Sequence, residues 1–317
     1  WINQACRYGG ESAMKVFITG ASSTPGYKIM LEFARAGYKV YAQFYSHVIP
    51  DTENVLKIKL DFVDELDKLV DVLNEVKPDI VIHTAALGDV DKCETDRGSA
   101  WRINVEATYA IAKKVGDLGN YILYLSTDYV FDGEKGMYRE EDVPNPINFY
   151  GLTKLVAENI VKSATDSYSI VRTSHIYGFG MGRKNFARYV IESLSQGIRV
   201  RALVDQWLSP TLNTLLAKAI REIVEVRYTG VLHVAGEKIN RHDFAKAIAK
   251  KFNFNELLID PISMNEIRFL AKRPRDSSLD TSKARELVKT NFYTLNDSLD
   301  VLYSEWLELQ RGRGNAF

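Results

Sequence analysis

Residues that can exchange a proton with a substrate oxygen follow a predicted buried strand. Ser126-Thr127-Asp128 comes directly after the apolar residues 121–125, and Tyr150 and Lys154 stand four positions apart at the start of a predicted helix. Residues with this spacing lie on one face of a helix. A lysine ammonium beside a phenol lowers its pKa from about 10, which suits proton exchange near neutral pH. We therefore predict Thr127, Tyr150 and Lys154 as catalytic residues, with Thr127 bonded to the same oxygen.

A second group suited to chemistry is the turn over residues 19–26, Thr-Gly-Ala-Ser-Ser-Thr-Pro-Gly, between a β-branched run and a predicted helix. Glycines there let the backbone approach a pyrophosphate, and the helix N-terminus offers free N–H groups. This predicts NADPH or NADH as cofactor, with contacts from Gly20, Ser22, Ser23, Pro25 and Gly26. A serine at the middle position adds a Cβ where the phosphate comes closest, which weakens the prediction. An ordinary strand–turn–helix is the alternative.

The end of the second predicted strand bears on the choice between the two cofactors. Residues 43–47 hold no carboxylate for an adenosine ribose, and no arginine for a 2′-phosphate. The missing carboxylate leans weakly towards NADPH, and the preference stays open. Asp61, after the third strand, is either an adenine contact or a helix N-cap.

The elements that position these residues alternate regularly. Short apolar runs that indicate buried strands are separated by amphipathic stretches such as residues 27–36 and 63–76; the runs are residues 15–19, 38–44, 79–83, 121–125 and 169–172. Strict alternation implies parallel strands with helices on both faces. We predict an α/β fold with a doubly wound parallel (Rossmann) sheet and a smaller, interleaved C-terminal substrate lobe.

Domain boundaries follow from the same pattern. A strand begins just after Met14, so residues 1–13 are predicted to be an extension outside the fold. Residues 14–175 are predicted to form the NAD(P)-binding domain. Residues 176–310 are predicted to form mainly the substrate lobe, with a strand near 230–235 returning to the sheet.

Composition excludes several functions. The 41 basic and 41 acidic residues among 317 give no net charge, unlike nucleic-acid binders. No run approaches the ~20 apolar residues of a membrane span, and the two cysteines form no disulfide framework. The five histidines lack metal-ligand spacing, so no metal is expected. We expect a cytoplasmic protein without nucleic-acid or membrane partners, with a homodimer left open.

Several motifs occur together in one order: residues 126–133 (STDYVFDG), 150–154 (YGLTK), 172–178 (RTSHIYG), 209–211 (SPT) and 273–280 (RPRDSSLD). From about residue 15 to 302 the chain resembles the dTDP-4-dehydrorhamnose reductase family of extended short-chain dehydrogenases, as an archaeal-like member. The resemblance implies NAD(P)H-dependent reduction of the C4 keto group of a dTDP-linked 6-deoxy-4-ketohexose, in dTDP-L-rhamnose synthesis.

The resemblance also implies roles for individual residues. It places the catalytic triad at Thr127, Tyr150 and Lys154, with Lys154 also touching the nicotinamide ribose. Near the cofactor it adds Ala85, Ala86 and Asn104, and near the sugar nucleotide Val90, Asp91, Tyr129, His175, Asn185 and Arg273.

Two departures from the family pattern stand out. Ser23 replaces a glycine, and His175 stands where the family carries a tryptophan near the sugar. These keep an alternative open, because a non-catalytic regulatory subunit of methionine adenosyltransferase resembles the same reductases. A nucleotide-sugar epimerase or dehydratase is the other alternative. Dehydratases of this type carry Asp-Glu after the threonine, whereas here Tyr129 follows Asp128, which favours reduction.

Overall fold

The structure of the protein is a computed structural model that describes residues 13–314, with side chains from 13 to 311. Apart from Ala13, the predicted N-terminal extension therefore lies outside the described residues. None of the helices in the described part of the chain combines the length and apolar composition that crossing a bilayer requires.

Seven parallel strands form the central sheet, in the order β11-β6-β5-β4-β1-β2-β3. They are β1 (Lys15–Thr19), β2 (Lys39–Phe44), β3 (Val55–Lys59), β4 (Ile80–His83), β5 (Tyr121–Thr127), β6 (Tyr168–Thr173) and β11 (Gly230–His233). Every residue of β4 and β5 is buried, as expected for the centre of a sheet covered on both faces. The predicted doubly wound α/β fold is confirmed.

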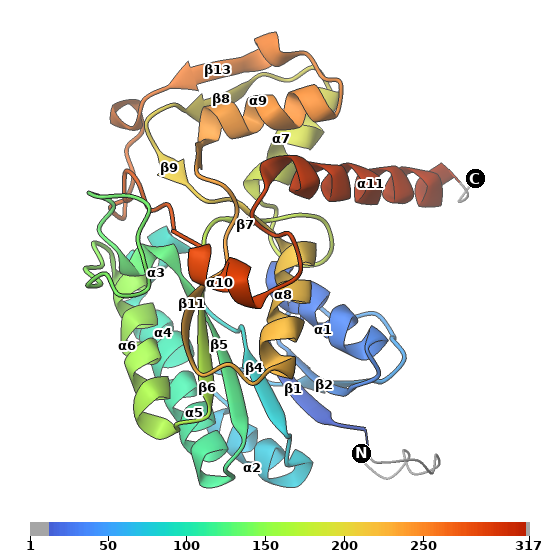
Figure 1. Cartoon of the computed structure of the whole chain (residues 1–317), viewed down its shortest axis with the longest axis vertical. Coiled ribbons are helices and arrows are strands. Elements are labelled where there is room, and N and C mark those ends of the chain that lie inside the picture. Colours follow the sequence, from blue (N-terminus) through green and yellow to red (C-terminus); the bar gives the residue numbers. More distant parts are fainter. Residues whose placement is uncertain (1–12, 315–317) are drawn as a thin grey trace.

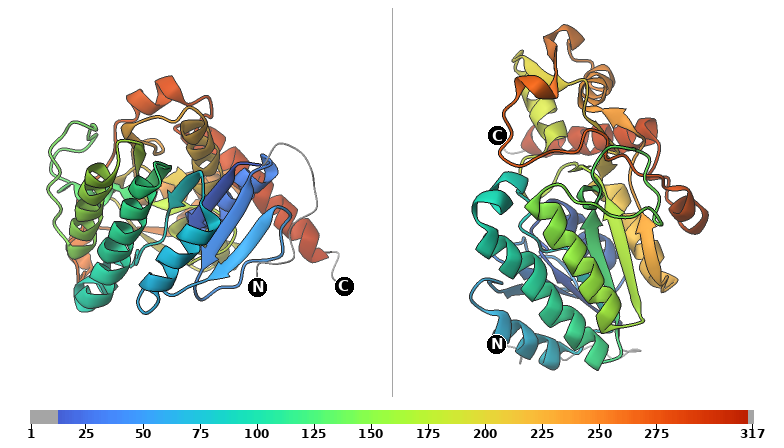
Figure 2. Two further views of the ribbon diagram at one scale, coloured as in Figure 1. Left: turned by 90° about the horizontal axis from the view of Figure 1, so that it is seen from below. Right: turned by 90° about the vertical axis from the view of Figure 1, so that its left-hand side faces the viewer.

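Helices cover both faces because successive side chains of a strand point to opposite sides. Val16 and Ile18 pack with α1 (Thr24–Arg35) and α8 (Asn213–Glu225), whereas Phe17 packs with the helices of the opposite face. Those are α2 (Leu66–Val76), α5 (Ala107–Asp117) and α6 (Phe149–Ala164), and Figure 2 shows them side by side. Three short turns lead into α5: α3 (Val90–Thr95), α4 (Arg97–Trp101) and the π-helical η1 (Arg102–Glu106).

A smaller lobe lies beyond the carboxyl ends of the sheet strands, at the top of Figure 1. Its core pairs β8 (Val200–Leu203) with β13 (Ile259–Ile262), against α7 (Phe186–Ser195) and α9 (Arg241–Lys251). The chain enters this lobe twice, because α8 and β11 return to the sheet in between, so the predicted interleaving is confirmed. The remaining elements are short ladders, single turns and the last two helices: β7 (Ile176–Tyr177), β9 (Trp207–Leu208), β10 (Thr211–Leu212), β12 (Ile239–Asn240), η2 (Asp128–Val130), η3 (Glu256–Leu258), η4 (Met264–Glu266), α10 (Ser282–Leu287) and α11 (Leu295–Gly314).

The strand order reverses direction between β1 and β4, which is where ligands bind in open α/β sheets. The two strand ends are tied together there. The Thr19 hydroxyl hydrogen-bonds His83 Nδ1 over 2.7 Å and accepts from the Ala85 N–H over 3.1 Å. The loops after β1 and β4 therefore lie together at the carboxyl edge of the sheet, which faces the small lobe.

Candidate active site

The turn after β1 is closely packed against the loop after β4. Gly20 has a φ of +63°, and a Cβ there would lie 2.8 Å from the Ala85 Cα. A Cβ on Gly26 would lie 2.1 Å from the Gly20 carbonyl oxygen. Only glycine fits these two positions, and the resulting bare backbone at the start of α1 is the arrangement that a dinucleotide pyrophosphate requires.

Ser23 has a defined structural role in this turn. It is the N-cap of α1, with φ −80° and ψ 167°, and its hydroxyl accepts a hydrogen bond from the Gly26 N–H over 3.1 Å. This conformation needs no glycine, so a serine is compatible with the backbone of the turn. Ser22 precedes the cap, and Pro25 occupies the first turn of the helix, where its missing N–H costs nothing.

The loop after β4 is held against α6 by Asn104. Its Oδ1 accepts from the Leu87 N–H over 2.8 Å, and its Nδ2 donates to the Thr153 hydroxyl over 3.0 Å. Asn104 lies in the π-helical turn η1, and such turns are frequent at functional sites. Because its amide is engaged within the protein, Asn104 positions the loop that carries Ala85 and Ala86.

At the end of β2, Gln43 links two turns of the edge. Its Oε1 accepts from the Gly20 N–H and its Nε2 donates to the Leu60 carbonyl, both over 2.8 Å. Asp61 accepts from the Val63 N–H over 2.8 Å, whereas α2 starts only at Leu66. The helix N-cap reading of Asp61 is therefore wrong, and its adenine contact stays a prediction.

The candidate proton donor lies at the carboxyl end of β5. Tyr150 is in the first turn of α6, and its ring meets that of Tyr129 edge-on at 6.1 Å. Burial raises the pKa of Tyr150 above its usual value, and the Thr127 hydroxyl offsets part of that shift. The phenol is therefore protonated at neutral pH, as a donor to a developing alkoxide must be.

Lys154 is not among the groups that shift the pKa of Tyr150 most, and that pKa is raised, so the lowered value expected from the sequence is not found. The Lys154 Nζ donates to the Leu125 carbonyl over 2.8 Å and lies 4.2 Å from the centre of the Tyr124 ring. Burial lowers the pKa of Lys154 to about 7, while the Glu158 carboxylate acts to raise it. Lysine and tyrosine thus share the predicted helix face, but the amine is held by the strand behind it.

Behind Thr127 lies a buried acid. Asp128 accepts hydrogen bonds from the hydroxyls of Thr127 (3.0 Å), Ser174 (2.8 Å) and Ser277 (2.5 Å). Burial raises the pKa of Asp128, and these hydroxyls counteract the shift. Because Ser277 comes from the segment after the small lobe, Asp128 joins that segment to the end of β5.

Four of the predicted substrate residues also lie at this edge. Arg273 forms an ion pair with Asp91 over 3.0 Å, and Asp91 accepts from the Ala271 N–H over 3.0 Å. Val90 is the first residue of the same helix, α3. Tyr129 completes this side of the site through its contact with Tyr150.

The other two predicted substrate residues lie on the side of the small lobe. His175 has a φ of +43°, unusual for a residue other than glycine, and its Nε2 lies 3.3 Å from a guanidinium nitrogen of Arg241. Asn185 caps α7, accepting from the Arg188 N–H over 3.2 Å, and donates to the Gly178 carbonyl over 2.8 Å. The Asn185 amide thus ties the start of α7 to the preceding segment at Gly178. Sequence reasoning missed Arg241, since no motif marks it.

A glycine-rich segment, residues 178–184, was also missed. A Cβ on Gly182 would lie 2.4 Å from the Thr24 backbone nitrogen, so this segment lies against the N-terminus of α1. Arg183 pairs with Asp89 of the loop after β4 over 3.0 Å. The sequence does carry a signal for this segment, because glycine occupies the alternate positions 178, 180 and 182.

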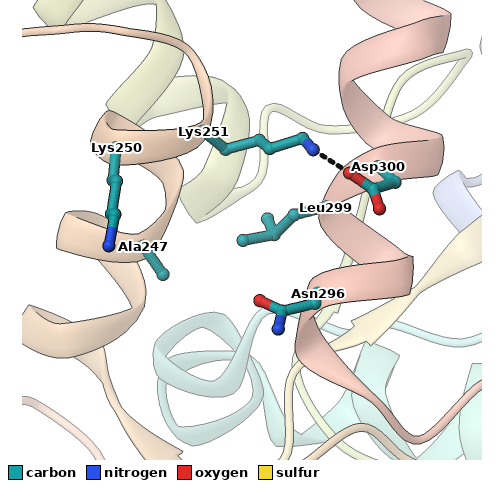
Figure 3. A pocket seen from close by; sticks show the side chains of 6 residues that line it. All are labelled: Ala247, Lys250, Lys251, Asn296, Leu299 and Asp300. Atoms are coloured by element: carbon teal, nitrogen blue, oxygen red, sulfur yellow. Dashed lines mark ion pairs between the residues drawn. The ribbon is translucent and has the colours of Figure 1, made fainter.

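A cavity of about 650 Å³ lies between α9 and α11 (Figure 3), and none of the site residues described above lines it. Its polar lining includes Lys250, Asn296 and the ion pair of Lys251 with Asp300. Within the described residues, no group of three or more His, Cys, Asp or Glu gathers to hold a metal ion.

A doubly wound fold with a glycine turn at its switch point and a tyrosine and lysine on the helix after β5 defines a class, the short-chain dehydrogenase type. A family described as the RmlD substrate binding domain matches residues 14–306, and the chain belongs to this family.

Solved structures agree with this membership. A hypothetical dTDP-4-dehydrorhamnose reductase from Sulfolobus tokodaii is 41% identical, with a TM-score of 0.79, covering 90% of this chain and 98% of that one. The dTDP-4-dehydrorhamnose reductase from Bacillus anthracis, solved in complex with NADP, is 28% identical with a TM-score of 0.81, covering 92% and 99%.

Curated relatives include both a reductase and a methionine adenosyltransferase subunit, the two kinds of protein that the sequence resembles. A dTDP-4-dehydrorhamnose reductase from Aggregatibacter actinomycetemcomitans is 30% identical over 86% of this chain and 92% of its own length. The methionine adenosyltransferase 2 subunit beta of Bos taurus is 31% identical over 86% and 82%. The family match and the matches to reductases confirm the predicted family, the NAD(P)-dependent oxidoreductase class and the nicotinamide cofactor.

Proposed function

We propose that the chain reduces the C4 keto group of a dTDP-linked 6-deoxy-4-ketohexose with NADPH or NADH, as in dTDP-L-rhamnose synthesis. The observation that carries the proposal is the position of the Tyr150 phenol beside Thr127, on the edge that also holds the glycine turn. Membership of the RmlD family and the similarity to dTDP-4-dehydrorhamnose reductases support the choice of sugar nucleotide.

In this proposal each catalytic side chain has one task. The bound nicotinamide supplies the hydride. Tyr150 donates its proton to the oxygen that becomes an alkoxide, and the Thr127 hydroxyl orients that oxygen. Lys154, when protonated, contributes positive charge from its place on the Leu125 carbonyl and contacts the nicotinamide ribose.

The two parts of the chain divide the binding. We assign the dinucleotide to the domain of residues 14–175, through the backbone at Gly20, Ser22, Ser23 and Gly26 and through the loop of Ala85 and Ala86. We assign the sugar nucleotide mainly to residues 176–310, together with α3. The ion pair of Asp91 with Arg273 supports this division, because it joins the two parts beside Tyr129.

Reduction is favoured over elimination by the state of Asp128. A dehydratase needs an acid free to move a proton at the sugar ring. Here the Asp128 carboxylate is buried and accepts from three hydroxyls. The acid next to Thr127 therefore has a positioning role.

The test follows NADPH and NADH oxidation in separate reactions with the dTDP-linked 4-keto sugar, and identifies the product by NMR. We expect oxidation that depends on the sugar and a C4 alcohol as product. Dinucleotide binding measured by calorimetry, without oxidation, would instead support the non-catalytic subunit that the bovine relative suggests.

A further inference from the structure

Arg241 is a guanidinium held by two neutral side chains. Its Nε donates to Gln206 Oε1 over 2.6 Å, and its Nη1 donates to His175 Nε2 over 3.3 Å. Its guanidinium carbon lies 5.2 Å from the centre of the Phe186 ring. Burial and the charge of Arg241 hold the pKa of His175 well below its usual range, so the imidazole is neutral. These contacts fix the position of the cation without compensating its charge.

No carboxylate pairs with Arg241 among the side chains of residues 13–311, although twenty ion pairs form elsewhere in that range. Arg273, whose charge acts on Arg241, is itself paired with Asp91. Asp128 acts on Arg241 electrostatically, but it forms no ion pair with it, and its carboxylate accepts hydrogen bonds from three hydroxyls instead. A partly buried cation without a counter-ion is costly, and an anionic ligand would remove that cost.

The position of Arg241 indicates which ligand this is. Gln206, which holds Arg241, also donates to the Pro274 carbonyl over 3.5 Å, next to Arg273. The charges of both arginines act on the Tyr129 hydroxyl, and the Tyr129 ring lies beside that of Tyr150. Both guanidiniums therefore lie close enough to act electrostatically on Tyr129, Arg241 from the small lobe and Arg273 from its ion pair with Asp91 of α3.

Building on the proposed function, we propose that Arg241 binds the diphosphate of the nucleotide-sugar substrate together with Arg273, while Gln206 and His175 hold its guanidinium in place. A guanidinium carries five N–H donors, and the protein uses two of those of Arg241. The remaining donors suit the paired oxygens of a phosphoryl group. Arg241 would thus decide that the ligand is a nucleoside diphosphate and not a nucleoside.

The test is calorimetric titration of dTDP and of thymidine into wild type and Arg241→Gln, both with NADP present. We expect wild type to prefer dTDP strongly. Arg241→Gln should weaken dTDP binding roughly 10- to 100-fold, as for a lost hydrogen bond between charged groups. Thymidine binding should stay within a few-fold. Arg199→Gln, which removes an exposed lobe arginine that pairs with Asp260, is the matched control and should leave both affinities unchanged.

Arg241→Lys keeps a positive charge and should retain part of the preference for dTDP, provided that its NADP affinity shows an intact fold. If both variants bind dTDP as wild type does, the inference is overturned and the proposed reduction stands. The same conclusion applies if both variants bind dTDP normally but lose turnover, because Arg241 would then contact the sugar and not the diphosphate. If wild type binds no dTDP, the proposed function itself fails, and this inference with it.

Discussion

Glu158 and Arg172 face each other in the protein core, where Arg172 Nε donates to Glu158 Oε1 over 2.9 Å and Nη2 donates to Oε2 over 2.7 Å. Both side chains are almost fully buried, at 0% and 2% exposed. Glu158 stands one helical turn after Lys154 and also accepts from the Ser126 hydroxyl over 2.6 Å. This pair therefore supports Lys154, the lysine proposed as catalytic, and the end of β5.

Removing one member of that pair should strongly destabilise the folded protein. Glu158→Gln leaves the Arg172 charge buried and uncompensated, which costs about 3–5 kcal/mol. Glu192→Gln is the matched control, because Glu192 pairs with Lys184 on the surface, and it should cost less than about 1 kcal/mol. Urea unfolding of the two variants measures the difference. Equal losses of unfolding free energy in the two variants would mean that the buried ion pair stabilises the protein no more than the surface pair does.

Tyr150→Phe keeps the ring and its contact with Tyr129 but removes the proton donor. Turnover should fall by about 10²–10⁴-fold, while dinucleotide affinity changes little. Thr127→Val, which is nearly isosteric, should lower turnover more than binding. Steady-state kinetics and calorimetry separate the two effects. A Tyr150→Phe enzyme within a few-fold of wild type would show that another group gives the proton.

Lys154 should make stability depend on pH. Its pKa is about 7 in the folded protein, because burial disfavours the charged form, and near 10.4 in an unfolded chain. Between these values the unfolded state binds more protons, so stability rises with pH. From pH 7 to pH 9, wild type should gain about 2 kcal/mol more than Lys154→Met. Unfolding curves at both pH values test this, and equal gains would contradict the lowered pKa.

Ser23 should matter for the helix more than for the cofactor. Ser23→Ala removes the cap of α1 and should cost about 1 kcal/mol, whereas Ser23→Gly should cost only a few tenths. Dinucleotide affinity of both variants should stay within a few-fold of wild type. Thermal unfolding and calorimetry provide the two readouts. A large loss of affinity in Ser23→Ala alone would indicate that the hydroxyl binds the phosphate.

The fold and the family could be predicted from the sequence because their signals are local. Buried strands such as β4 and β5 are continuous apolar runs. The turn from Gly20 to Gly26 and the spacing of Tyr150 and Lys154 each lie within a few residues. By contrast, β7, β9, β10 and β12 have two residues each, too few to show any period.

Only the tertiary structure determines the contacts between residues that are far apart in the chain. Lys154 bonds to a strand carbonyl 29 positions away, and Asp128 accepts from Ser277, 149 positions away. Arg241 reaches His175 over 66 positions. Packing alone determines which partners these groups meet and how much water they lose. The pKa values and charge balance of the site depend on both, so no local pattern of residues specifies them.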